Sequence, residues 1–459
     1  MGAAGVPVDP AWLAATLSRL ADTHQIPGAQ LAVHHGGVTV AVEVGELEHG
    51  VEIPVTEETA FPIGSISKAW TATLAMILVA DGDLELDAPL DEHLAELDDL
   101  VGRLTLRQLL SHTSGFADIP ELCTLSPGRY VREHCRRQDL VLPPDSAFSY
   151  SSRNYVLTGH LIETITGMSW WEAMESILLR PLGVDPATIT DAQRAPYARP
   201  IATGHSVNTA LGRIRPVQQS MAPAEAPAGA LAMSAVDLVA LGLMHIGQGV
   251  PNLLPAADAE RMRQAVPGAD PFGLADGWGP GLAVFRNGTT EWVGHDGNAN
   301  GTCCYLRIDP AGGWVVALTT NASTGSSLWQ ELRTRLRQAS IPLGAHGGDI
   351  SPLGQGEPPA ECVGSYSNGP AEWLVTADNW GLCLARGGDL IARLAISNDM
   401  SFVVQDLASG QRLHSGRFLR DPITKQIELL QIFGRTARRR PPAVPEPRSS
   451  ADSLRRASA

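Results

Sequence analysis

The sequence Phe61-Pro62-Ile63-Gly64-Ser65-Ile66-Ser67-Lys68 places a serine and a lysine three residues apart at the start of a predicted helix. Helical spacing continues to Ala80, and Asp81-Gly82 is expected to end the helix. Because residues three apart share one face of a helix, the Ser65 hydroxyl and the Lys68 amine should lie together. A hydroxyl held beside an amine can act as an activated nucleophile.

Lys68 is one of only two lysines in the chain. Lys and Arg together number 34, and the other lysine is Lys425, which leaves 32 arginines. A guanidinium stays charged, whereas a buried ammonium has a lowered pKa and can lose its proton. The apolar residues after Lys68 should bury it, so we interpret Lys68 as a base. The simpler alternative is a helix-capping serine followed by a solvated lysine, and the pair alone does not decide between them.

Two later segments offer further candidate groups. In Phe148-Ser149-Tyr150-Ser151-Ser152, a tyrosine between small hydroxyl residues could pass a proton to or from Ser65. In Gly294-His295-Asp296-Gly297-Asn298, which follows a predicted strand over 290–293, a loop would leave backbone N–H groups free to hold an oxyanion. Taken singly, each segment is more typical of a structural loop than of a catalytic site.

In this order, Ser-x-x-Lys, Tyr-x-Ser and His-x-Gly resemble the serine β-lactamase and penicillin-binding-protein-like family, specifically its class C β-lactamase, D,D-peptidase and esterase branch. The resemblance covers roughly residues 10–340. Other stretches that carry it are residues 27–29 (PGA), 81–90 (DGDLELDAPL), 109–115 (LLSHTSG), 181–183 (PLG) and 228–238 (AGALAMSAVDL).

The resemblance implies a role for each matching residue. Ser65 would be the nucleophile that forms an acyl-enzyme, and Lys68 and Tyr150 would be a coupled base and proton relay. The backbone N–H groups of Ser65 and Asn298, beside Gly297, would form the oxyanion hole.

Two positions depart from the family pattern. His295 stands where β-lactamases usually carry the lysine of Lys-Thr-Gly, which puts capture of a β-lactam carboxylate in doubt. Ser152 replaces the amide of Tyr-x-Asn and offers fewer hydrogen bonds to a substrate amide. Neither departure touches the nucleophile.

The order of predicted elements indicates an α+β fold, an antiparallel sheet flanked by helices with a helical subdomain, over residues 1–341. The expected elements are a helix over 11–25, a hairpin over 29–34 and 38–44, helices and loops to about 245, strands over 281–286, 290–293, 303–308 and 314–319, and a helix over 327–339.

The rest of the chain divides into three segments. Residues 342–359 are rich in glycine and proline and predict a linker. Residues 360–440 predict a small lipocalin-like β-barrel that opens at 364–366, has strands over 372–376, 381–386, 401–404, 412–418 and 426–431, and closes at 433–435. Residues 441–459 predict a disordered tail.

A catalytic domain of this kind followed by such a barrel is similar to the stand-alone thioesterases that release and cyclise nonribosomal peptides. The similarity implies that a peptidyl carrier protein delivers a peptidyl thioester to Ser65 and that the peptide's own amine ends the acyl-enzyme. Arg435, near the end of the barrel, would contact the substrate. The alternatives are an esterase, a β-lactamase-like hydrolase or a D-amino-acid peptidase, and also a non-catalytic β-lactam-binding protein.

Composition excludes several other classes of protein. A net charge of −15 argues against a nucleic-acid partner. The first ten residues lack a secretion signal and no apolar stretch is long enough for a membrane span, so we expect a cytoplasmic protein. The six cysteines fit neither a zinc site nor a disulfide framework, which predicts reduced thiols, no metal and no cofactor. The oligomeric state stays open.

Overall fold

The computed structural model divides the chain into two compact units, residues 1–348 and 349–459. The structure describes residues 8–118, 125–190, 199–343, 359–379, 381–407, 412–421 and 423–441. Of the predicted linker and tail, only residues 342, 343, 359 and 441 are therefore described.

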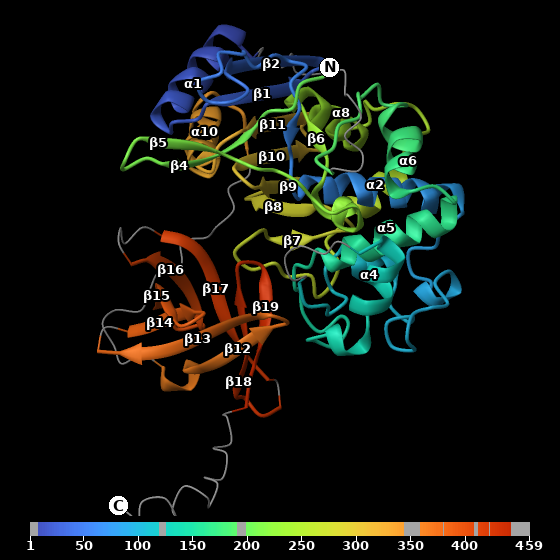
Figure 1. Cartoon of the computed structure of the whole chain (residues 1–459), viewed down its shortest axis with the longest axis vertical. Coiled ribbons are helices and arrows are strands. Elements are labelled where there is room, and N and C mark those ends of the chain that lie inside the picture. Colours follow the sequence, from blue (N-terminus) through green and yellow to red (C-terminus); the bar gives the residue numbers. More distant parts are fainter. Residues whose placement is uncertain are drawn as a thin grey trace, which may run out of the picture. The chain divides into compact units, whose positions relative to one another are not determined.

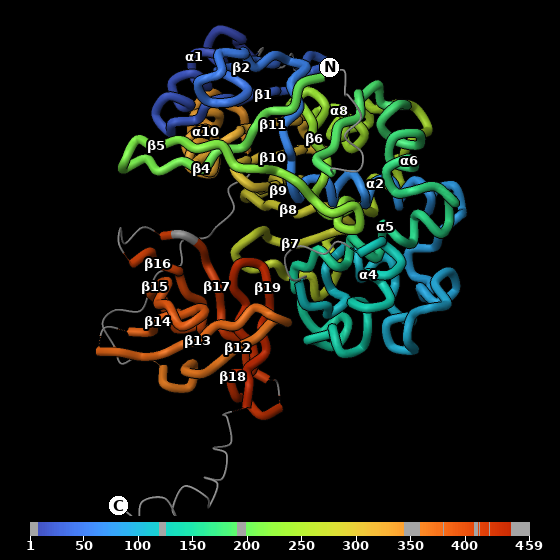
Figure 2. Tube along the Cα trace, viewed as in Figure 1, coloured from blue at the N-terminus to red at the C-terminus, as the bar shows by residue number. Residues whose placement is uncertain are grey.

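A seven-stranded antiparallel sheet forms the centre of the first unit (Figure 1). Its strand order is β2 (Val38–Gly45), β1 (Gly28–His35), β11 (Trp314–Thr320), β10 (Thr302–Asp309), β9 (Thr290–Ala299), β8 (Ala283–Asn287) and β7 (Gly277–Trp278). The trace in Figure 2 shows the first strands beside the last, and Leu31 pairs with Leu318. Every residue of β10 and β11 is buried, so both faces of the sheet are covered.

Helices α1 (Pro10–Thr23) and α10 (Gly325–Gln338) cover one face of the sheet. The Asp9 carboxylate accepts the Ala11 N–H at 2.9 Å and caps α1, and proline stands at its first position. Leucines spaced three and four residues apart on the two helices pack on alternate residues of the strands. These leucines are Leu13, Leu17, Leu20, Leu328, Leu332 and Leu336.

Helices α2 (Ile66–Asp81) and α8 (Ala235–His245) pack against the opposite face, beside a helical subdomain. All residues of α2 from Ile66 to Leu78 are buried, and Gly82 ends the helix in the left-handed conformation. The other helices of this part are α3 (Leu106–Leu110), α4 (Pro127–His134), α5 (Arg153–Thr166), α6 (Trp170–Ala173), α7 (Ala226–Gly229) and α9 (Ala256–Arg263). The predicted fold class is confirmed.

Two expectations for the first unit are wrong. Strand β9 does not end at Val293 but continues to Ala299, because β10 pairs with it along its length and Asn298 faces Cys303. The segment expected to hold helices and loops also contains a hairpin of β4 (Gly204–Asn208) and β5 (Arg213–Val217), and the short strand β6 (Ala232–Met233), which pairs with β3 (Phe61–Pro62). These strands lack the apolar alternation that predicts a sheet.

The second unit contains a closed barrel of eight antiparallel strands, and the predicted small barrel is confirmed. Tyr366 and Ser367 of the first strand pair with Arg439 and Arg438 of the last. Its strands are β12 (Gly364–Asn368), β13 (Ala371–Asp378), β14 (Gly381–Arg386), β15 (Asp389–Ile396), β16 (Ser401–Asp406), β17 (Arg412–Arg420), β18 (Ile427–Ile432) and β19 (Arg435–Arg439). Sequence reasoning missed β15, whose pairing with β14 is interrupted by a register shift.

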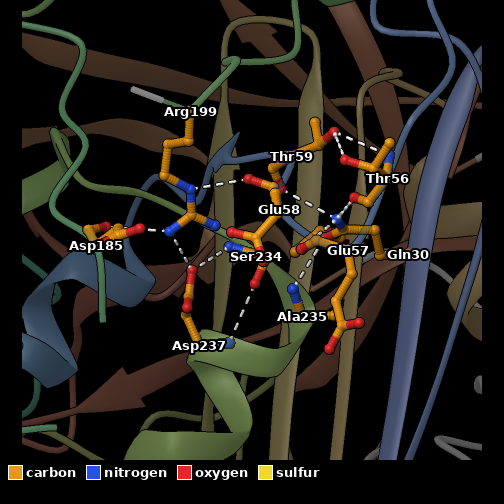
Figure 3. A network of polar contacts seen from close by, with 11 residues as sticks. Gln30, Thr56, Glu57, Glu58, Thr59, Asp185, Arg199, Ser234, Ala235 and Asp237 are labelled. Atoms are coloured by element: carbon orange, nitrogen blue, oxygen red, sulfur yellow. Dashed lines mark hydrogen bonds and ion pairs between the residues drawn. The ribbon is translucent and has the colours of Figure 1, made fainter. Parts of the chain in front are cut away.

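A buried polar network holds the segment that leads to Ser65 (Figure 3). The Arg199 guanidinium pairs with Asp237 at 2.9 Å and donates to the carbonyl groups of Glu58 and Asp185 at 2.8 and 3.0 Å. Asp237 and Ser234 form a capping box at the start of α8. The arginine thereby fastens residues 58–59 to α8.

Gln30 of β1 completes this network. Its side-chain amide donates to the carbonyl groups of Thr56 and Thr59 at 2.7 and 3.0 Å, and its carbonyl oxygen accepts the Ala235 N–H at 2.9 Å. Strand β3 comes directly after the segment 56–59 and pairs with β6. The chain that leads to Ser65 is therefore held by the polar network and by this strand pairing.

Among the described residues, no helix has the length and apolar content that a bilayer span requires. The described cysteines are free thiols, namely Cys135, Cys303, Cys304, Cys362 and Cys383, whereas Cys123 lies outside the described residues.

Replacing Arg199 should destabilise the first unit strongly. Arg199→Ala leaves Asp237 and two carbonyl groups without their buried partner, so we expect a loss of about 3–5 kcal/mol in the free energy of unfolding. Arg180→Ala, which removes an exposed pair with Glu175, should cost less than about 1 kcal/mol. Urea unfolding of both variants checks this, and equal losses would contradict the assigned role of the buried network.

Candidate active site

Ser65 stands at the turn between β3 and α2, where it is partly buried. Gly64 before it has φ +51°, and an added Cβ would lie 2.3 Å from the carbonyl oxygen of Asn298. Only glycine fits both the conformation and the close approach of β9. The sharp turn leaves the serine at the first turn of a buried helix.

Lys68 lies one turn into α2 and is almost completely buried, with 1% of its surface exposed. Its Nζ is 3.1 Å from Ser65 Oγ and donates to the Ala228 carbonyl oxygen at 2.7 Å. The carbonyl orients the amine, and a neutral amine in this position can accept the serine proton. The expected burial of Lys68 and its meeting with Ser65 are both observed.

Tyr150 lies in the segment before α5 and brings its ring to the same place. The ring centroid is 5.1 Å from Lys68 Nζ and 6.2 Å from the ring of His295. The ring is partly buried, in keeping with a group that both the amine and a substrate can reach. Its role as proton relay stays a prediction.

His295 is buried in β9, with 2% of its surface exposed, rather than in a loop. Its Nδ1–H donates to the Asp296 carbonyl oxygen at 2.6 Å, so Nε2 carries the lone pair. Burial, and then the positive charge of Lys68, lowers the pKa of His295 to about 4. At neutral pH the site therefore presents an uncharged acceptor where a lysine would present a cation, and no described residue hydrogen-bonds Nε2.

The end of β9 forms the wall opposite Ser65. Pairing with β8 stops at Gly294, and beyond it β9 approaches residues 63–65. An added Cβ on Gly297 would lie 1.9 Å from the Ile63 carbonyl oxygen, so glycine permits this contact. Among the described residues, the Ser65 N–H has no hydrogen-bond partner. The Ser65 N–H is therefore available for the predicted oxyanion hole, whereas the part of the Asn298 N–H stays a prediction.

The structure brings Ser65, Lys68, Tyr150 and His295 together, beside Gly297 and Asn298. Ser152 stands directly before α5, where its backbone N–H donates to the Asp118 carboxylate at 2.8 Å. Arg435 begins β19 in the second unit, so its contact with a substrate stays a prediction. The catalytic roles of all these residues remain predictions.

Sequence reasoning missed two groups in the site. One is the Ala228 carbonyl, although residues 228–231 belong to a stretch that carries the family resemblance. The other is Trp278 of β7, whose ring lies 5.3 Å from His295 and 5.8 Å from Tyr150. No local motif surrounds Trp278, and only the folding of the sheet brings it to the site.

Comparison with known proteins gives consistent matches. A family profile described as Beta-lactamase matches residues 13–341. Penicillin-binding protein 4 of Amycolatopsis lactamdurans is 34% identical over 71% of this chain and 89% of its own length. Unguisins hydrolase ungD' of Aspergillus campestris is 26% identical over 67% of this chain and 60% of its own length.

The structural likeness to a protein called SurE extends over both units. Its crystal structure has a TM-score of 0.84 and 38% identity, and the match covers 94% of this chain and 99% of SurE. A second SurE structure, with D-Leu, has a TM-score of 0.80 and the same identity.

We expect Lys68→Arg to be nearly as damaging as Lys68→Ala. Arginine keeps the charge but cannot release its proton, and its larger head does not fit between Ser65 and Ala228. Both variants should slow acylation of Ser65 by about 10³-fold or more. Acylation by an activated ester, followed by mass spectrometry, measures this, and an active Lys68→Arg enzyme would disprove the base role.

The buried neutral His295 should weaken the fold in acid. Its native pKa of about 4 lies below the usual 6.5, so the unfolded chain binds the extra proton and stability falls as pH drops from about 6.5 to 4. The group contributes on the order of 3 kcal/mol to this loss.

His295→Gln removes this titration. Urea unfolding at pH 7.5 and 4.5 should show a smaller acid loss for the variant than for the natural chain. His245, which is also buried, is present in both proteins and cancels. An unchanged loss would show that His295 does not titrate in this way.

Proposed function

This chain belongs to the Beta-lactamase family, and we propose that within it the enzyme takes a peptidyl thioester onto Ser65 and releases it as a macrocyclic peptide. Membership of the family supports a serine enzyme that works through an acyl-enzyme. The cyclising activity is the further step.

Two transfers make up the proposed reaction. In the first, Ser65 Oγ attacks the thioester carbonyl, and its proton passes through Lys68 and Tyr150 to the departing thiolate, which leaves as a thiol. In the second, the N-terminal amine of the same peptide attacks the ester. It loses a proton to the Lys68–Tyr150 pair, which returns one to Ser65 Oγ as the amide forms. The Ser65 and Asn298 N–H groups would hold the oxyanion in both steps.

The likeness to SurE is the observation that carries the proposal. It spans the catalytic unit and the barrel, whereas the family profile ends at residue 341. The two-unit architecture is what makes the chain similar to stand-alone peptide-cyclising thioesterases. Because SurE was solved with D-Leu, we extend the proposal to an acyl group whose last residue is a D-amino acid.

The chemistry of His295 supports the same substrate. A free carboxylate beside the scissile bond, as in a β-lactam, is best met by a fixed cation. The lowered pKa of His295 leaves an uncharged acceptor there instead. A peptidyl thioester has no carboxylate at its reacting end, so its binding loses no ion pair when His295 is uncharged.

We further propose that a peptidyl carrier protein presents the thioester and that Arg435 contacts the peptide. Carrier delivery follows from the thioester chemistry, since such chains are held on a carrier thiol. The position of Arg435 at the start of β19 makes it a partly buried cation at one end of the barrel.

A hydrolase is the second candidate. The chain is 26% identical to a relative named as a hydrolase of unguisins, and the same acyl-enzyme could be ended by water. Nothing in the geometry around Ser65 by itself selects an amine over water. The products of one reaction distinguish these two functions.

The test is a linear peptide carried as an N-acetylcysteamine thioester with a C-terminal D-Leu. We expect a cyclic product, lighter than the linear acid by one water, and no turnover by Ser65→Ala. The L-Leu diastereomer should react at least about tenfold more slowly, since one well-placed contact is worth more than 1.4 kcal/mol. Liquid chromatography with mass spectrometry measures all products.

A peptide with an acetylated N-terminus is the matched control, because it can acylate Ser65 but cannot cyclise. Linear acid as the sole product from the free-amine peptide would favour the hydrolase. A stable Ser65 adduct with a β-lactam and no turnover of any thioester would indicate a binding protein.

A further inference from the structure

His112 belongs to the LLSHTSG stretch at residues 109–115, and no residue of this stretch has a role in the proposed reaction. The residue follows α3 and is completely buried. Its φ of +59° lies in the left-handed region, which is uncommon and strained for a residue other than glycine. A histidine held in this conformation points to a demand on its side chain.

Three hydrogen bonds fasten His112 to the segment that carries Tyr150. The Ser149 N–H donates to the His112 carbonyl oxygen at 2.9 Å. The Ser151 N–H donates to Nδ1 at 3.1 Å, and the Asn154 side chain approaches Nδ1 at 3.2 Å. The contacts flank Tyr150 on both sides in sequence.

These contacts also decide where the imidazole proton lies. A backbone N–H can only donate, so Nδ1 must accept. The Ser114 hydroxyl donates to Asn154 Oδ1 at 2.6 Å, which turns the amide nitrogen toward His112. A proton on Nδ1 would face two donors, so the ring is held uncharged, with its hydrogen on Nε2.

The His112 ring lies against the ring of Tyr150. Their centroids are 4.3 Å apart and the rings are inclined by 31°. Trp278 meets Tyr150 edge-on at 5.8 Å and His112 at 5.4 Å. Tyr150 itself lies in no helix or strand, so these two rings give its phenol a fixed position.

We propose that His112 is a positioning residue, which holds the Tyr150 ring against Lys68 through this ring contact and through its bonds to residues 149, 151 and 154. This inference rests on the proposed acyl-transfer role of Tyr150. In this proposal His112 acts through Tyr150 and not on the substrate. It acts by keeping the phenol within proton-transfer distance, where a shift of about 1 Å can cost about 100-fold in rate.

His112→Asn is the informative variant. Asparagine tolerates the left-handed backbone, and its side-chain oxygen can replace Nδ1 as acceptor, so the segment stays bonded while Tyr150 loses the ring beside it. The rate of Ser65 labelling by a fluorophosphonate should fall about 10- to 100-fold, with a small change in Tm. The pH dependence of labelling should shift as well, because it reports the Lys68–Tyr150 pair.

A double-mutant cycle separates positioning from a general structural role. In a Tyr150→Phe background, adding His112→Asn should slow labelling by less than about twofold, because the group being positioned is gone. His245→Asn, at another buried histidine, should lower Tm but leave labelling within about twofold.

Each outcome of this experiment decides the inference. Equal losses in both backgrounds, or a loss of Tm with no loss of labelling, would overturn it. The fluorophosphonate probe needs no peptide. If Ser65 is labelled but no peptide is cyclised, the proposed cyclase activity is rejected, while the labelling rates still test the positioning role of His112. A natural chain whose Ser65 does not label at all would overturn both.

Discussion

The Lys68 amine is buried beside the Ser65 hydroxyl, and this costly contact is the centre of the site. An ammonium group inside a protein is costly unless it is bonded, and a neutral amine is favoured there. Lys68 is buried because α2 is buried along nearly its whole length. The buried amine donates one hydrogen bond to the Ala228 carbonyl oxygen. This burial supports the prediction that Lys68 acts as a base.

The sheet and the helical subdomain then converge on this pair. Gly64 and Gly297 let β9 come within contact of the turn that carries Ser65, and the network around Arg199 and Gln30 holds residues 56–59, which lead to that turn. Tyr150 lies in a segment that is neither helix nor strand, and its ring contacts the rings of His112 and Trp278. His295 stays uncharged at neutral pH, so it adds no cation beside Lys68.

Local chemistry explains which elements could be predicted from sequence. The bounds of α2 follow from apolar spacing and Gly82, and the first hairpin from a Gly-Gly turn between apolar arms. The end of β9 was placed wrongly because glycines and polar residues replace the alternation that identifies a strand, and pairing with β10 supplies what the sequence lacks. Strand β15 was missed for a related reason, since a register shift interrupts its pairing.

The sequence alone marked Ser65 and Lys68 as a candidate nucleophile and base and predicted the fold class, because helical spacing and a scarce residue type are local facts. It also marked Tyr150 and His295 as candidates. Only the tertiary structure decided that His295 is buried and uncharged, that Trp278 and His112 enclose Tyr150, and that the Ala228 carbonyl orients Lys68. Burial and the charge of Lys68 set the pKa of His295, and Trp278 contacts the ring of Tyr150; each of these pairs joins residues more than a hundred positions apart in the chain.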